Sequence, residues 1–119
     1  MNTRDNNLAQ RGGDVRVSCY SDLNAEVVVA DDSTVSKTLH QDERIKVVLF
    51  GFAAGQELSE HTASVPAIVH VLEGTARLTL GGEVMSTQAG SWVHMPANLP
   101  HSVLARTPVK MLLTLLRDA

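Results

Sequence analysis

The sequence predicts an all-β fold, a sandwich or barrel built from eight or nine short strands. Its apolar residues fall in runs of five to eight, the length of a strand, and turn residues separate the runs. Many short strands at such spacing are typical of these two architectures. With 119 residues, 44% of them hydrophobic, the chain has room for one domain with a core of its own.

The runs and turns place the expected strands in order along the chain. Gly81-Gly82 is a strong signal for a two-residue hairpin, because glycine tolerates positive φ at both positions. The last run could instead form a short helix, but its length and its place after a series of strands favour a strand. The expected strands are residues 25–30, 36–40, 46–53, 66–73, 75–80, 83–87, 91–95, 101–105 and 109–116.

Two of these segments, 46–53 and 109–116, are apolar on both strand faces. One face of each can fill the barrel, and the other needs a cover. A second copy of the protein would supply that cover, so we expect a homodimer. The alternative is that the N-terminal strands fold across this face.

Composition excludes several classes of function. The net charge of -3 has no long block of either sign, and aromatic residues make up only 3%, which argues against a nucleic-acid partner. No apolar run is long enough for a membrane span, and the first 14 residues contain no apolar core of the length that a signal peptide needs. Cys19 alone cannot form an internal disulfide. We therefore expect a cytoplasmic protein with a flexible polar tail over residues 1–14 and a single domain over 15–119.

Four of the five histidines lie between residues 61 and 101, among regularly spaced glycine and proline residues. The first group is Gly55, His61 after five residues, and Gly74. The second is Gly90, Pro96 after five residues, and His101 after four more. These intervals resemble the two signature motifs of the cupin superfamily, as found in small single-domain microbial cupins. The resemblance implies a jelly-roll double-stranded β-helix barrel of the RmlC-like type, often paired as a homodimer.

In cupins that carry the full motifs, three histidines and one glutamate hold a divalent metal inside the barrel. In this sequence only His61 and His101 occupy such positions, since alanine stands at the other two, Ala63 and Ala67. Asn98 replaces a turn glycine, a tolerable change because asparagine enters the left-handed region readily. The resemblance thus implies a depleted site that holds Fe, Mn, Zn or Ni through two histidines, or no metal at all.

Strand alternation separates the remaining histidines from this pair. His70 and His94 should point out of the barrel, toward solvent or a subunit contact, and His40 has no motif around it. Glu57 and Glu60 are expected in a loop before His61. The cavity should then be lined mainly by apolar side chains, which are Ala63, Ala67, Val69, Val71, Val93, Met95 and Val103.

Such a cavity is suited to a small, mostly apolar molecule held by one or two polar groups. Three functions stay open at this point. The protein is a metal-free binding module for a small-molecule ligand, a metal-dependent oxygenase, isomerase or decarboxylase, or a structural and interaction module without a site. The catalytic residues of an enzyme of this kind cannot be assigned from the sequence.

Overall fold

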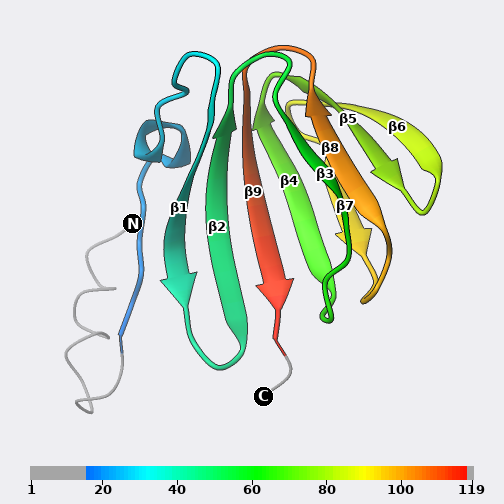
Figure 1. The fold of residues 1–119 in the computed structure, drawn as a ribbon. Helices are drawn as coiled ribbons and strands as arrows, with labels where there is room; N and C mark the ends of the chain where they lie inside the picture. Colours follow the sequence, from blue (N-terminus) through cyan, green and yellow to red (C-terminus); the bar gives the residue numbers. More distant parts are fainter. Residues whose placement is uncertain (1–15, 118–119) are drawn as a thin grey trace.

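A computed structural model describes residues 16–117, and its architecture is two antiparallel sheets packed face to face (Figure 1). One sheet has the strand order β1-β2-β9-β4-β7, and the other has β3-β8-β5-β6. The strands are β1 (Thr34–Gln41), β2 (Ile45–Phe52), β3 (Glu57–His61), β4 (Ala67–Glu73), β5 (Thr75–Leu80), β6 (Glu83–Gln88), β7 (Trp92–Met95), β8 (His101–Ala105) and β9 (Val109–Leu116). The predicted all-β jelly-roll class is confirmed.

Turn chemistry sets the connections between several strands. Gly81 and Gly82, which join β5 to β6, have φ of 57° and 90°, the combination that a tight two-residue hairpin needs. Asn98 has φ of 67°, so it takes the left-handed place expected of it before β8. At Gly74, with φ of 87°, a Cβ atom would lie 2.0 Å from the Pro108 carbonyl oxygen, so only glycine fits between β4 and β5.

The main core lies between the two sheets. Alternate residues of β4 and β9 point inward, and the register pairs Val69 with Leu113 and Val71 with Met111. Phe52, Leu78 and Val71 are at most 1% exposed, and together with their neighbours they form one continuous apolar cluster. Burial of this area is the main force that holds the sheets together.

The segment 25–30 is not a strand, contrary to the expectation. It begins in a short 3₁₀ helix, η1 (Leu23–Glu26), and then crosses the outer face of the five-stranded sheet. Val27 and Val29 lie over Gly51 of β2, where a Cβ would meet them at 3.3 and 3.4 Å. Val27 and Val29 therefore pack onto a sheet face. Val28, between them, points away from the sheet and is 79% exposed.

This crossing segment covers part of the outer face, near β1 and β2 (Figure 1). It forms a second apolar cluster in which Val27, Leu39 and Leu49 are buried. The Tyr20 hydroxyl donates to the Leu39 carbonyl at 2.7 Å, which ties the chain just before η1 to β1. The predicted flexible tail, residues 1–14, lies outside the described residues. Among residues 16–117, no helix is long and apolar enough to cross a membrane.

Candidate functional site

A pocket opens between the two sheets, and His61 and His101 lie at it. Its cavity volume is about 30 Å³, room for about two water molecules, so a larger ligand fits only if the lining side chains move apart. Strands of both sheets contribute, so the pocket belongs to the interior of the jelly roll. Its walls are apolar except for the two imidazoles and one serine, and they consist of Leu58, His61, Val69, Leu78, Leu80, Met95, His101, Ser102, Val103, Met111 and Leu113.

A β-bulge in β3 brings His61 to the pocket. Leu58 pairs with Val103 and His61 pairs with His101, so Ser59 and Glu60 together face the single residue Ser102. Without this extra residue, strict alternation would place Leu58 and His61 on opposite faces of the strand. The bulge lets both side chains line the same pocket.

Glu57 and Glu60 therefore lie in strand β3, where a loop was expected, and both are exposed. Neither side chain is in the pocket lining. The observed loop is shorter than the expected one, because β3 begins soon after the turn at Ala54-Gly55.

The two imidazole rings are in contact and are held in the same way. Their centroids are 4.2 Å apart and their planes make an angle of 60°. Nδ1 of His61 bonds the Ser59 carbonyl at 2.8 Å, and Nδ1 of His101 bonds the Leu99 carbonyl at 2.8 Å. A carbonyl oxygen only accepts, so each Nδ1 carries a proton and donates it. Each Nε2 is left for a ligand, since within residues 16–117 it has no hydrogen-bond partner.

The apolar residues expected around the histidines are divided between the pocket and the adjoining core. Val69, Met95 and Val103 line the pocket itself. Ala67 and Val71 are buried in the core cluster beside it, and Val93 packs against that cluster. Ala63 follows β3, and its carbonyl accepts a hydrogen bond from the Asn98 amide at 2.7 Å. The walls also include Leu58, Leu78, Leu80, Met111 and Leu113, which the motifs alone did not indicate.

His70 and His94 lie away from this pocket. They belong to β4 and β7, where the register pairs Ile68 with His94 and His70 with Trp92 on the outer side of the sheet. Trp92 is 61% exposed, and His94 is exposed as well. His40 lies on β1 and is hydrogen-bonded to the side chains of Ser18 and Asp42. Cys19 is a free, exposed thiol.

Comparison with known proteins identifies the family. The model of the Cupin domain family matches residues 48–115, which is more than half of the chain. This protein is a cupin.

Solved structures of similar proteins agree with the fold. A conserved protein of unknown function from Streptococcus pyogenes is 30% identical, with a TM-score of 0.79 over 88% of this chain and 92% of its own. An RmlC-like cupin from Desulfovibrio desulfuricans is 32% identical, with a TM-score of 0.75 over 85% and 97% of the two chains. No protein of curated function matches the chain.

A putative mannose-6-phosphate isomerase from Ralstonia eutropha is also similar in structure. It is 20% identical, with a TM-score of 0.74 over 84% of this chain and 99% of its own. At this level of identity the likeness concerns the fold, and an activity has to be argued from the site itself.

The donor set of this cupin does not fit a tightly held resident metal. Within residues 16–117 there is no group of three or more histidine, cysteine, aspartate or glutamate side chains placed to hold an ion. Catalytic metal sites in proteins usually have at least three protein ligands, whereas the His61 and His101 imidazoles are two. The pocket is thus an apolar cavity with two oriented imidazoles.

Proposed function

We propose that this cupin binds a small, mostly apolar organic molecule between its sheets, without a resident metal. In this proposal the Nε2 atoms of His61 and His101 contact the one polar group of the ligand. The observation that carries the proposal is the pair of Nδ1 bonds to strand carbonyls, which orients both rings and leaves their Nε2 atoms for the ligand. Apolar walls with a few oriented polar groups are typical of ligand cavities.

The chemistry of the two imidazoles limits the polar group of the ligand. In the neutral form, with Nδ1 protonated, Nε2 accepts a hydrogen bond, which suits a hydroxyl group. In the protonated form Nε2 donates, which suits a carboxylate. The neutral form therefore suits small alcohols and phenols, and the protonated form suits carboxylic acids with a short hydrocarbon body.

Thermal unfolding in EDTA tests this proposal with four probes, namely hexanoate, 1-hexanol, benzoate and benzyl alcohol. A ligand that binds only the folded protein raises its stability, by about 2.7 kcal/mol at a hundredfold excess over Kd. We expect at least one probe to raise the Tm in EDTA, and His61→Ala and His101→Ala to remove the increase. His70→Ala, on the outer side of β4, is the control that should retain it.

Three outcomes would contradict the proposal. One is that EDTA abolishes the rise in Tm, since a metal would then be needed. The second is that no probe raises the Tm, which would favour a structural role for the barrel. The third is that both histidine variants respond like the unmodified protein, since the probe would then bind without the two imidazoles.

One observation favours a second candidate, a metal-dependent enzyme. Histidines that bind metals usually donate their other ring N–H to a carbonyl or carboxylate, which is how Nδ1 of His61 and of His101 is bonded. In this candidate the two imidazoles hold a divalent ion such as Fe, Mn, Zn or Ni, and water occupies its other positions. Metal content distinguishes the two candidates.

A further inference from the structure

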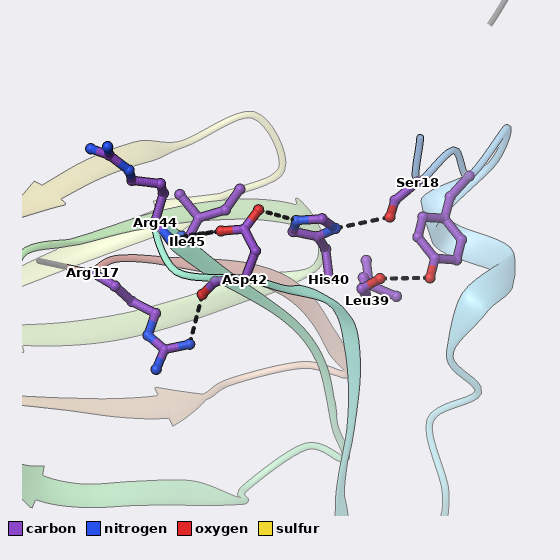
Figure 2. A network of polar contacts seen from close by, with 8 residues as sticks. Ser18, Leu39, His40, Asp42, Arg44, Ile45 and Arg117 are labelled. Carbon is purple, nitrogen blue, oxygen red and sulfur yellow. Dashed lines mark hydrogen bonds and ion pairs between the residues drawn. The ribbon is translucent and has the colours of Figure 1, made fainter. Parts of the chain in front are cut away.

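A second cluster of reactive side chains lies outside the cavity, where the chain before η1 meets the end of β1. Ser18 Oγ is 2.8 Å from Nδ1 of His40, and Nε2 of His40 is 2.6 Å from Oδ2 of Asp42 (Figure 2). Hydroxyl, imidazole and carboxylate thus form one continuous hydrogen-bonded chain. Serine, histidine and aspartate in this order activate a serine nucleophile in unrelated hydrolase folds. There the serine bonds Nε2 and the aspartate bonds Nδ1, whereas here the two ring nitrogens are exchanged.

The carboxylate of this chain is held firmly in place. Oδ1 of Asp42 accepts hydrogen bonds from the backbone amides of Arg44 at 2.7 Å and Ile45 at 2.9 Å (Figure 2). Arg117 donates to the backbone carbonyl of Asp42 at 2.8 Å. The hydrogen bond with His40, followed by those from the two amides, holds the pKa of Asp42 well below its usual range. An ionised carboxylate only accepts, so Nε2 of His40 carries a proton and Nδ1 can accept one from Ser18.

An apolar groove adjoins the serine and could seat a substrate. Its volume is about 320 Å³, and it lies on the outer face of the five-stranded sheet. Ser18 is exposed at this groove and therefore within reach of a substrate. The groove is lined by Ser18, Tyr20, Leu23, Leu39, His40, Ile45, Val47 and Leu112.

We propose that Ser18 is a nucleophile toward small carboxylic esters, activated by His40, which Asp42 orients. The hydrocarbon part of the acyl group would lie against the apolar walls of the groove. This site is separate from the cavity of His61 and His101, so its test is independent of the function proposed for that cavity.

The reaction has two steps, acylation of Ser18 and hydrolysis of the acyl-Ser18 ester. Ser18 Oγ attacks the ester carbonyl carbon while its proton passes to Nδ1 of His40. The bond to the alkoxide then breaks, and the leaving alcohol takes that proton. Water then attacks the acyl-Ser18 ester while its proton passes to Nδ1 of His40. The bond between Oγ and the acyl carbon breaks, and Oγ takes that proton back, which releases the carboxylic acid and restores Ser18. The His40 and Asp42 side chains are 30% and 48% exposed, so we expect a gain near the lower end for acid–base catalysis, about 10²-fold.

Hydrolysis of p-nitrophenyl butyrate and labelling by a fluorophosphonate probe test the proposal on the full chain. We expect the probe to form a covalent adduct on Ser18, located by peptide mass spectrometry. Ser18→Ala should lose the adduct and about 10²-fold in hydrolysis rate, and Asp42→Asn should lose most of that rate. The Tm of each variant shows that it is folded.

Matched controls separate this mechanism from simpler reactions of the same ester. Cys19→Ala removes the neighbouring exposed thiol, and His94→Ala removes another exposed imidazole. Both variants should hydrolyse the ester at the rate of the unmodified protein. An unlabelled Ser18, or a folded Ser18→Ala variant that keeps the full rate, would overturn the proposal.

Discussion

At the scale of single residues, the strand on which each histidine sits decides what it can do. Alternation along β4 and β7 is regular. The outward position of His70 and His94 could therefore be predicted, because each directly follows a valine that points inward, Val69 or Val93. The position of His61 depends on the bulge in β3, which alternation alone does not indicate. The hydrogen-bonded chain of Ser18, His40 and Asp42 could not be predicted from the sequence either. Ser18 and His40 are 22 residues apart, and Ser18 lies in an irregular segment whose path the sequence pattern does not indicate.

Asp42 should make stability depend on pH in acid. Its pKa is lowered from the ordinary value of 3.8 by the bonds from His40 and the two backbone amides. In acid the unfolded chain therefore takes up a proton at higher pH than the folded chain does. The stabilisation from this carboxylate is present above about pH 4 and is lost as the pH falls further, toward the folded pKa.

Thermal unfolding between pH 7 and pH 2.5 checks this expectation. The Tm of Asp42→Asn should fall less steeply below pH 4 than that of the unmodified protein, since asparagine takes up no proton. Glu43→Gln is the matched control, because this neighbouring carboxylate makes no such bonds among the described residues. Equal slopes for the unmodified protein and Asp42→Asn would refute the role of Asp42.

At the scale of elements, the regular strands were predictable and the N-terminal segment was not. The bounds of β5 and β9 agree with the expected 75–80 and 109–116, because Gly74 and Gly81 enclose the first and alternation is clear in it. The run 25–30 has strand-like composition, but its valines pack across Gly51 and η1 precedes them. Composition shows that such a run is apolar and does not show whether it pairs with a strand edge or lies on a sheet face.

We expect a homodimer to form through the outward face of β4 and β7, here called the outer strip. The N-terminal segment covers the face near β1 and β2, whereas Trp92 on β7 stays 61% exposed beside His70 of β4. An exposed tryptophan at a strand face is the kind of side chain that anchors protein interfaces. The expected partner for this strip is a second copy of the chain, because its isologous packing would cover both strips at once.

Size-exclusion chromatography with light scattering tests the dimer and its surface. We expect the mass of a dimer at micromolar concentration, and the mass of a monomer for Trp92→Glu. Val84→Glu is the matched control, since Val84 is also 61% exposed but lies on β6 of the other sheet, and it should stay dimeric. A monomeric unmodified protein, or a dimeric Trp92→Glu, would show that this strip is not the interface.

At the scale of the whole molecule, the jelly roll supplies a cavity and the side chains in it decide the chemistry. The family motifs survive at the turns and at two histidines, whereas Ala63 and Ala67 remove two polar groups that metal-binding cupins have. The fold was predictable because glycine and proline spacing encodes its turns. The chemical character of the cavity is set by side chains from six strands, and these include residues such as Leu78 and Met111 that belong to neither motif.

Metal content of the protein, purified without a chelating tag, tests the central claim most directly. Elemental analysis by inductively coupled plasma mass spectrometry should find Fe, Mn, Zn, Ni and Cu each far below one ion per chain. His61→Ala and His101→Ala should leave these values unchanged, because two imidazoles alone hold an ion only weakly. One ion per chain in the unmodified protein, lost in both variants, would contradict the metal-free cavity and establish a two-histidine metal site.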